Sequence, residues 1–209
     1  MIGGNVMKTD RKEIITEVAF LLALKNGFNN VSIKEIQETS GFSAGSIYYY
    51  FEDKNEILLH MLNVYLLENF YKYRDAIKDS KIPFFEKIES IFYYLLGFNQ
   101  KELSSPDTLN MSKCDNRDFF GLFSSIFHQH PETRPIFYKL HTESYDFYRE
   151  LVQEAVKNNE IKYDMDVESL AIFIHTIFKG YIDLCLFHPD LQIEELIDSN
   201  LKMIKEMTN

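Results

Sequence analysis

The sequence predicts an all-α protein, and three features support this fold class. With 8 Gly and 5 Pro in 209 residues, breaks in regular structure are few, which favours long helices. Apolar residues recur at spacings of three and four along most of the chain, which places them on one face of a helix. No long segment shows the alternation that is typical of a strand, and no internal repeat is present. The length suits one mid-sized domain or a small domain fused to a larger one.

The first predicted helix covers residues 10–26, where apolar side chains such as Ile15 form one stripe. Gly27 follows, and its freedom to adopt the left-handed conformation predicts the end of the helix. A second helix starts soon afterwards. Ser32 and Glu35 have the spacing of a capping box, in which each side chain bonds the backbone N–H of the other residue.

This second helix is predicted to be only two turns long, because residues 39–41 (Thr-Ser-Gly) supply a turn. Ser43 then begins another short helix, which ends at Phe51. Asp53 caps a long helix that runs to about Ile77 and spans roughly 35 to 40 Å at about 1.5 Å per residue. Two short helices joined by a glycine-containing turn, after a longer helix, form the helix-turn-helix arrangement, whose second short helix lies in the major groove of DNA.

The second short helix has two distinct faces on a helical wheel. Its inner face carries Ala44, Ile47 and Phe51, its outer face carries Gly45, Ser46 and Tyr49, and its flanks carry Tyr48 and Tyr50. Small residues let the backbone approach base edges, and phenol hydroxyls can donate to phosphate oxygens. Lys34 and Lys54 could bind phosphates from either side. The alternatives are an aromatic core cluster for residues 48–51 and solvated charges for the two lysines.

Two stretches carry a resemblance to a known family: residues 31–36 (VSIKEI) and residues 41–58 (GFSAGSIYYYFEDKNEIL). They are similar to the DNA-binding domain of TetR-family transcriptional regulators, and the similarity is dense over residues 10–60. Residues 37–40 (QETS) depart from the alanines that are usual in that family. This departure predicts looser or hydrogen-bonded packing of the first short helix.

The resemblance implies a regulator with two domains. A helix-turn-helix DNA-binding domain would cover residues 8–55, and a long helix would join it to a helical ligand-binding and dimerisation domain over residues 56–209. The last two helices would pair with a second copy in a four-helix bundle, and a small molecule would release most such repressors from their operators. The implied DNA contacts are Lys34, Ala44, Gly45 and Ser46 at the groove, and Tyr48, Tyr49, Tyr50 and Lys54 at the sugar-phosphate backbone or nearby bases.

Beyond Pro83 the sequence predicts five further helices. They cover about residues 83–98, 116–129, 131–157 and 166–187, and a last helix follows residue 190; a loop is expected at 104–107, an irregularity at Pro135 and a break at 158–159. The helix at 166–187 is apolar on nearly every face, so it should be covered on several sides.

Two sets of residues in this half are candidates for binding. Aromatic side chains could line a ligand cavity between helices, although an ordinary aromatic core explains the same residues. The candidate ligand contacts are Phe92, Phe119, Phe123, Phe127, His141, Phe173 and His175, with His128 and Asp183 as further polar anchors. The candidate dimer contacts are Phe173, Ile177, Gly180, Tyr181, Leu184, Ile193, Leu196, Ile197, Leu201 and Ile204.

The net charge of −10 at first argues against nucleic acid as a partner. Residues 1–55 carry six basic and seven acidic side chains, which leaves −9 for residues 56–209. Dimerisation reconciles a nearly neutral first part with DNA binding, because two copies could engage two half-sites together. The acidic second part favours a neutral or cationic ligand.

Other kinds of chemistry are disfavoured. No run of about 18 apolar residues is free of charge, so no membrane span is predicted, and residues 1–6 are expected to be a frayed tail. Cys114 and Cys185 form no CxxC pair, which favours a reduced, cytoplasmic compartment. His128 and His130 lack a third ligand at metal spacing, and no nucleotide-binding or hydrolase motif occurs. Neither a metal, nor a cofactor, nor enzymatic activity is therefore predicted.

The sequence thus predicts a cytoplasmic homodimer that resembles TetR-family regulators and binds a double-stranded DNA operator. The main hypothesis is a repressor that a small apolar or aromatic molecule releases from a palindromic operator. The alternative is a ligand-binding helical dimer that acts as an activator or binds no operator.

Overall fold

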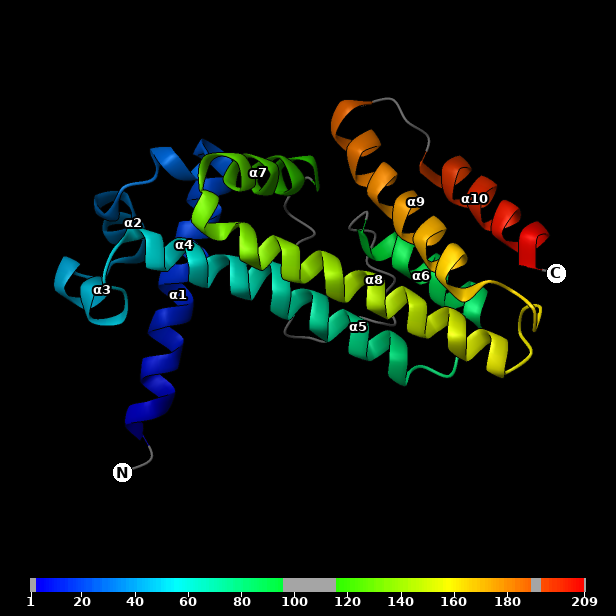
Figure 1. Ribbon diagram of the computed structural model, residues 1–209. Helices are drawn as coiled ribbons and strands as arrows, with labels where there is room; N and C mark the ends of the chain where they lie inside the picture. The colour runs from blue at the N-terminus through cyan, green and yellow to red at the C-terminus, as the bar shows by residue number, and fades with distance from the viewer. Residues whose placement is uncertain (1–2, 96–115, 189–192, 209) are drawn as a thin grey trace. The chain divides into compact units, whose positions relative to one another are not determined.

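The computed structural model describes residues 3–95, 116–188 and 193–208, and each regular element in these stretches is a helix (Figure 1). This confirms the all-α fold class. The elements are α1 (Gly3–Asn26), η1 (Phe28–Asn30), α2 (Ile33–Ser40), α3 (Ala44–Tyr50), α4 (Lys54–Leu62), η2 (Asn63–Glu68), α5 (Asn69–Asp79), α6 (Phe84–Leu95), α7 (Asn116–Gln129), η4 (Pro131–Thr133), α8 (Arg134–Lys157), α9 (Val167–Phe187) and α10 (Ile193–Thr208). No helix in the described stretches is both long and apolar enough to cross a membrane.

The chain divides into two compact units. The first comprises Met1–Asn69 and Gly121–Phe137, and the second comprises Phe70–Phe120 and Tyr138–Asn209. The expected domain boundary between residues 55 and 56 therefore lies inside the first unit. The physical reason is that the first turns of α4 bury Ile57, Leu58, Met61 and Leu62, so this helix is part of the core of the first unit.

The predicted capping signals determine the local structure of the first unit. Ser32 and Glu35 form the capping box at the start of α2: the Glu35 N–H donates to the Ser32 hydroxyl at 3.2 Å, and the Ser32 N–H donates to the Glu35 carboxylate at 2.8 Å. Gly41 ends α2 in the left-handed conformation, with φ 73° and ψ 7°. Ser43 caps α3 by accepting from the Ser46 N–H, so the turn between the two short helices is fixed at both ends.

The long helix after Asp53 contains a feature that the sequence analysis missed. Asp53 caps α4 as predicted, but residues Asn63–Glu68 (η2) are π-helical before α5 continues to Asp79. The Asn63 side chain donates to the Glu68 carboxylate at 2.8 Å across five residues, which suits the wider turn of a π-helix. Within the same segment Tyr65 stacks on Phe20 of α1, with ring centroids 4.0 Å apart.

Two other helices differ from the prediction. α1 begins at Gly3 instead of residue 10, so residues 3–6 are not the expected frayed tail; residues 5–26 contain neither Gly nor Pro to end the helix. The helix expected from residue 131 starts with the 3-10 turn η4, and α8 begins at Arg134. Pro135 lies in the first turn of α8, where a missing N–H is tolerated, so it causes no break. The loop expected at 104–107 lies outside the described residues.

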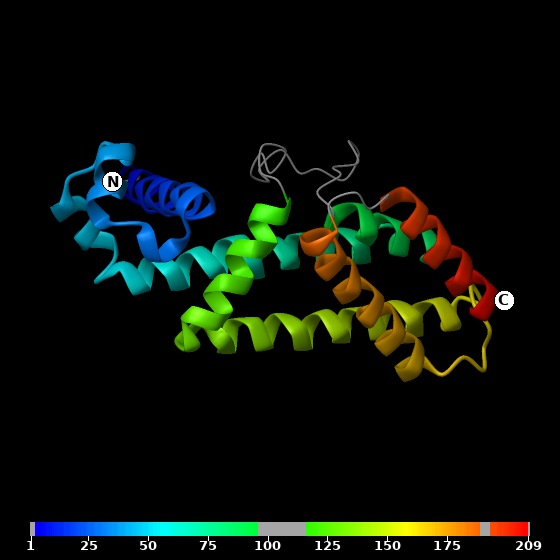
Figure 2. The ribbon, with the colours of Figure 1, turned by 90° about the horizontal axis from the view of Figure 1, so that it is seen from above.

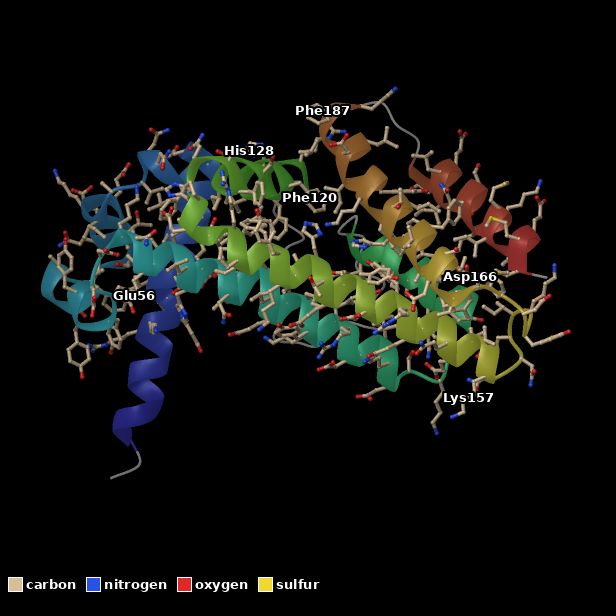
Figure 3. The ribbon with its side chains drawn as sticks, in the orientation of Figure 1. Glu56, Phe120, His128, Lys157, Asp166 and Phe187 are labelled. Atoms are coloured by element: carbon tan, nitrogen blue, oxygen red, sulfur yellow. The ribbon has the colours of Figure 1, made fainter. Side chains whose placement is uncertain are left out.

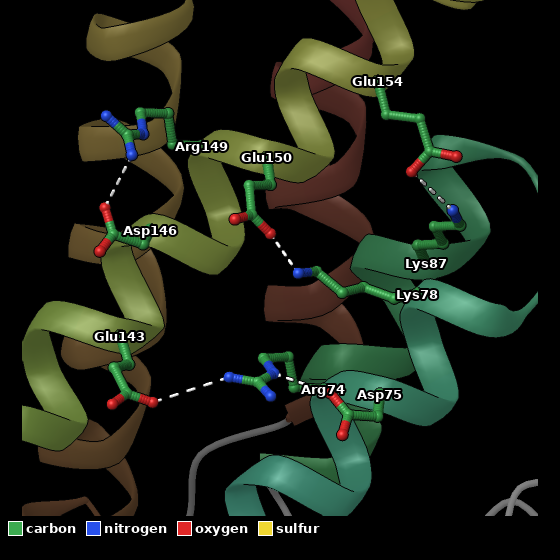
Figure 4. A network of polar contacts seen from close by, with 9 residues as sticks. All are labelled: Arg74, Asp75, Lys78, Lys87, Glu143, Asp146, Arg149, Glu150 and Glu154. Atoms are coloured by element: carbon green, nitrogen blue, oxygen red, sulfur yellow. Dashed lines mark hydrogen bonds and ion pairs between the residues drawn. The ribbon is translucent and has the colours of Figure 1, made fainter.

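The second unit packs α5, α6, α8, α9 and α10 around a core of apolar side chains, which includes Ile88, Phe147, Val152, Phe178 and Ile197. α9 and α10 run in opposite directions (Figures 1 and 2). Ion pairs join α8 to α5 and α6 (Figure 4): Arg74 with Glu143 at 3.6 Å, Lys78 with Glu150, and Lys87 with Glu154 at 3.2 Å. α8 ends at Lys157, and Asn159 follows in the left-handed conformation with φ 58°. The helix therefore breaks at residues 158–159, as predicted.

α9 is not covered on all sides within one chain. Asp166 caps its start and Phe187 lies at its end (Figure 3). Ile172, Leu184 and Phe187 are 55%, 40% and 79% exposed. The expected cover on several sides is therefore incomplete in the single chain, and an apolar stripe of α9 faces solvent.

Candidate nucleic-acid interface

α3 has the two faces that its wheel predicts. Ile47 and the following Phe51 are 0% and 1% exposed, so they anchor the helix to the core of the first unit. Tyr48 and Tyr49 are 54% and 64% exposed. Gly45 is also exposed, and a Cβ placed on it would meet nothing within 4 Å. The outer face of α3 is thus small at its start and phenolic at its end.

The three tyrosines of α3 are not equivalent. Tyr50 is half-buried, and its ring meets Tyr49 edge to face at a centroid distance of 5.0 Å. The alternative of an aromatic core cluster holds for Phe51, whereas Tyr48 and Tyr49 lie on the surface. Ala44 and Ser46 are half-buried and have short side chains. The backbone is therefore accessible at the first turn of α3.

The two candidate phosphate-binding lysines lie in different environments. Lys34 is exposed on α2, 3.7 Å from the carboxylate of Glu38 one turn later. Lys54 is half-buried: its ammonium donates to the carbonyl of Asn29 at 3.1 Å and lies 4.7 Å from the centroid of the Phe28 ring. Burial lowers the pKa of Lys54. Lys34 is therefore a surface cation in an exposed ion pair, and Lys54 is already bound within the chain.

Capping also reduces the influence of the nearby acidic side chains. Glu35 accepts from both the N–H and the hydroxyl of Ser32, each at 2.8 Å, and these hydrogen bonds lower the pKa of Glu35. Asp53 accepts from the Glu56 N–H at 2.8 Å, and Glu56 accepts from the Glu52 N–H at 2.6 Å. These three carboxylates face the positive ends of helices, which offsets part of their charge near α3.

A polar junction that the sequence does not reveal joins η1 to the corner between α7 and α8. The Asn29 amide donates to the Gln129 side chain at 2.6 Å, and its oxygen lies 2.8 Å from Nε2 of His130. His130 also meets the Phe28 ring edge to face at 5.7 Å. Since these residues are about 100 positions apart, no local pattern in the sequence could reveal the junction.

His128 and His130, considered as a metal pair, have separate protein partners. Nδ1 of His128 lies 2.8 Å from the Ser124 carbonyl, and His130 bonds Asn29 and Glu132. Among the described residues, no group of three or more His, Cys, Asp or Glu side chains could hold a metal ion.

Comparison with known proteins identifies the family. Residues 15–61, which run from the middle of α1 to the end of α4, match the sequence model described as bacterial regulatory proteins, tetR family. A TetR transcription regulator from Haloarcula marismortui has the same fold, with a TM-score of 0.72, 17% identity, and coverage of 96% of this chain and 98% of that one. Residues 15–61 thus match the tetR family, and the chain has the fold of a TetR transcription regulator.

Curated relatives match this chain over a shorter stretch. An uncharacterized HTH-type transcriptional regulator, YuxN of Bacillus subtilis, is 30% identical over 114 residues, which are 50% of this chain and 39% of that protein. The HTH-type transcriptional repressor KstR2 of Mycobacterium tuberculosis is 26% identical over 91 residues, 44% of each protein. The match thus spans less than half the length of both relatives.

The candidate ligand contacts are divided between the two units of the chain. Phe123 and Phe127 belong to the first unit, where Phe123 stacks with Phe20 at 6.4 Å. Phe92, Phe119, His141, Phe173 and His175 belong to the second. Of the further anchors, His128 lies in the first unit, and Asp183 is exposed on α9. The structure brings His141 and His175 together, with ring centroids 6.1 Å apart.

Four of the candidate dimer contacts are buried within the single chain. Tyr181, Ile197, Leu201 and Ile204 are 3%, 0%, 7% and 0% exposed, so they are buried in the core of their own chain and have no surface left for a partner. Gly180 and Leu184 are exposed, and Phe173, Ile177 and Leu196 are half-buried; the side chain of Ile193 lies outside the description. Exposed apolar side chains outside the candidate set are Ile172, Phe187, Met203 and Met207, which are 43% to 79% exposed.

Proposed function

We propose that this TetR-family chain is a homodimeric transcriptional regulator that reads DNA with α3. The observation that carries the proposal is the surface of α3, where exposed Gly45, Tyr48 and Tyr49 lie opposite the fully buried Ile47. Small residues allow close approach to base edges, and phenol hydroxyls donate to phosphates. The proposed contacts are Lys34, Ala44, Gly45, Ser46, Tyr48, Tyr49, Tyr50 and Lys54.

The two lysines take different roles in this proposal. Lys34 is exposed and would neutralise a phosphate directly, which also releases a counterion from the DNA. Lys54 would exchange or share its hydrogen bond to the Asn29 carbonyl when a phosphate approaches, because an ammonium has three donors. Loss of the hydrogen bond to Asn29 would therefore offset part of the free energy that Lys54 gains from a phosphate.

A dimer supplies the remaining affinity. The exposed apolar side chains of α9, Ile172, Leu184 and Phe187, would be covered by the second copy. Two copies related by a two-fold axis would place their α3 helices about 34 Å apart, in successive major grooves. The operator is then a palindrome, and a single copy should bind weakly.

A repressor of this kind would leave its operator when a small molecule binds the helical part of the chain. The ligand can shift the equilibrium only by its difference in affinity between the two states. A hundredfold loss of operator affinity requires about 2.7 kcal/mol of preference for the state that does not bind DNA. We further propose a cytoplasmic location and no catalytic step.

Selection of bound sequences from random double-stranded DNA by the purified chain tests the proposal. We expect a two-fold symmetric consensus, lost in a variant with Ile47→Asp, which disrupts the anchor of α3. The matched surface control is Thr39→Asp, on the exposed part of α2. An asymmetric consensus would contradict the two-fold dimer on DNA. No enrichment by an intact dimer would favour a ligand-binding protein without an operator.

A second titration tests repressor release. The operator-bound dimer is titrated with candidate small molecules while DNA binding is followed by fluorescence anisotropy. Release of the DNA supports a repressor. Simultaneous binding of ligand and DNA, without mutual weakening, would refute release and would favour an activator.

A further inference from the structure

A cluster of basic and phenolic side chains lies between α8 and α9 in the second unit. His141, Tyr145 and Tyr148 share one face of α8, because they are spaced by four and three residues. His175 and Lys179 are one turn apart on α9. The His175 ring lies 6.1, 6.2 and 5.5 Å from the rings of His141, Tyr145 and Tyr148, so the two faces meet at this histidine.

The basic groups of this cluster have no counter-charge among the residues that the structure describes. Nε2 of His175 is buried and has no hydrogen-bond partner. Neither His141 nor Lys179 forms a hydrogen bond or an ion pair with another residue that the structure describes. His141 is exposed, whereas His175 and Lys179 are half-buried. Because buried polar atoms in proteins are nearly always paired, the unpaired Nε2 of His175 is unusual.

The nearest acidic side chains are engaged elsewhere. Glu168 accepts from the Tyr145 hydroxyl and lies 3.8 Å from Arg149, which also pairs with Asp146 at 3.0 Å. Asp183 follows Lys179 by one turn of α9 but is exposed. The phenolic groups of Tyr148 and Tyr73 bring no charge of opposite sign at neutral pH, because burial raises the pKa of both.

Burial also affects the protonation of the basic groups. It lowers the pKa of Lys179 to about 8, so most of these ammonium groups remain charged at pH 7. Burial, Lys179 and His175 together lower the pKa of His141 to about 4, and burial and Lys179 lower that of His175. The folded chain therefore holds one poorly solvated positive charge beside two imidazoles that can each take up a proton.

We propose that His141, His175 and Lys179 form a binding site for the carboxylate group of an organic anion that carries an aromatic ring. Lys179 supplies the charge, the imidazoles supply hydrogen bonds, and Tyr145 and Tyr148 lie beside the ring of the ligand. This proposal rests on the proposed function, since it names the chemical class of the effector. It reverses the expectation from net charge, because the nearby groups are basic although residues 56–209 carry −9.

The proposal predicts a specific dependence on pH. An anion bound at the site favours the charged form of Lys179, so affinity should fall as this group loses its proton. With a pKa of about 8, the protonated fraction drops from about nine-tenths at pH 7 to about one-tenth at pH 9, which weakens binding about tenfold. Below pH 7 the bound carboxylate should also cause net proton uptake by His141 and His175.

Calorimetric titration of the full chain tests the site, without DNA. The probes are benzoate, phenylacetate and 2-naphthoate, each compared with its primary amide. We expect at least one carboxylate to bind at least tenfold more tightly than its amide at pH 7. Titration in two buffers of different ionisation enthalpy measures the proton uptake. Failure of all three carboxylates, or equal binding of acids and amides, would overturn the proposal.

Variants separate the site from a general attraction of anions to the surface. Lys179→Met should weaken the best carboxylate at least tenfold and remove the change in affinity between pH 7 and 9, whereas Lys179→Arg should keep most of the affinity. The control is Lys72→Met on α5, which removes an exposed cation and should have no effect. Circular dichroism confirms that each variant is folded. Equal affinity of Lys179→Met and the wild type refutes the site.

The outcome can be distinguished from that of the proposed function. Selection of an operator by a chain that binds none of the carboxylates would leave the regulator standing and reject this site. Carboxylate binding by a chain that selects no operator would support this site and reject the DNA-binding regulator.

Discussion

Replacement of Lys179 by methionine should make the free protein more stable. The ammonium of Lys179 is half-buried between α8 and α9 and has no counter-ion among the residues that the structure describes. Methionine has a similar length and no charge, so it can fill the same space without the cost of desolvation. A site that holds an unpaired charge for a ligand should be less stable than its apolar replacement.

The size of the effect follows from the pKa of Lys179, which burial lowers from 10.5 to about 8. Each pKa unit corresponds to about 1.4 kcal/mol, so the folded state is destabilised by about 3 kcal/mol at pH 7. Partial access of water reduces this value, and we expect the unfolding free energy of Lys179→Met to exceed that of the wild type by about 1 to 3 kcal/mol.

The direction of the pH dependence is also determined. Between pH 8 and 10.5 the unfolded chain keeps the proton on Lys179 while the folded chain releases it, so the stability of the wild type rises with pH in this window. The variant lacks this contribution. The advantage of Lys179→Met should therefore shrink by about half between pH 7 and pH 9.5, and it should nearly vanish at pH 10.5.

Urea denaturation followed by circular dichroism measures both effects. Protein concentrations are kept equal, because the stability of the proposed dimer would depend on concentration. Lys72→Met, on the exposed side of α5, is the matched control and should change stability by less than about 0.5 kcal/mol. A variant no more stable than the wild type at pH 7, or a difference that does not depend on pH, would show that Lys179 carries no uncompensated charge.

Three further predictions concern the caps, the DNA surface and the dimer. Ser32→Ala removes the capping box of α2 and should lower the unfolding free energy by about 1 kcal/mol in urea denaturation; no change would mean that water replaces the cap fully. Lys34→Ala should make the dependence of log K on log salt shallower by about 0.9 for each half-site, measured by anisotropy, whereas Lys81→Ala should leave the slope unchanged; equal slopes would remove Lys34 from the DNA contacts. Leu184→Lys puts a charge on the 40% exposed apolar stripe of α9 and should convert the dimer to a monomer in sedimentation velocity; an unchanged mass would place the interface elsewhere.

The sequence predicted best those features that depend on neighbouring residues. The capping box of Ser32 and Glu35, the caps at Ser43 and Asp53, and the inner face of α3 at Ile47 all follow from spacings of three or four residues. Such interactions form within one turn of a helix, so the local pattern contains the information that determines them.

Features that depend on distant residues could not be predicted in this way. The bond of Asn29 to Gln129 and the position of the Lys54 ammonium on the Asn29 carbonyl are set by packing, because nothing near residue 29 in the sequence specifies either partner. The periodicity of α10 correctly marked Ile197 and Ile204 as one face. It could not say whether that face meets the chain's own core or a second copy, and the structure assigns it to the core.

Net charge is a poor guide to the charge around a buried group for a related physical reason. Charges on a protein surface are screened within about 8 Å at physiological salt, and several acids of the second unit are paired, as Glu143 is with Arg74 and Glu154 with Lys87. Their sum therefore says little about the field at a buried point. That field is dominated by the few nearby charges without a counter-ion, and between α8 and α9 Lys179 is such a charge. An acidic chain can thus present a basic site, and the cost of holding Lys179 without a counter-ion is the same quantity that a bound carboxylate would recover.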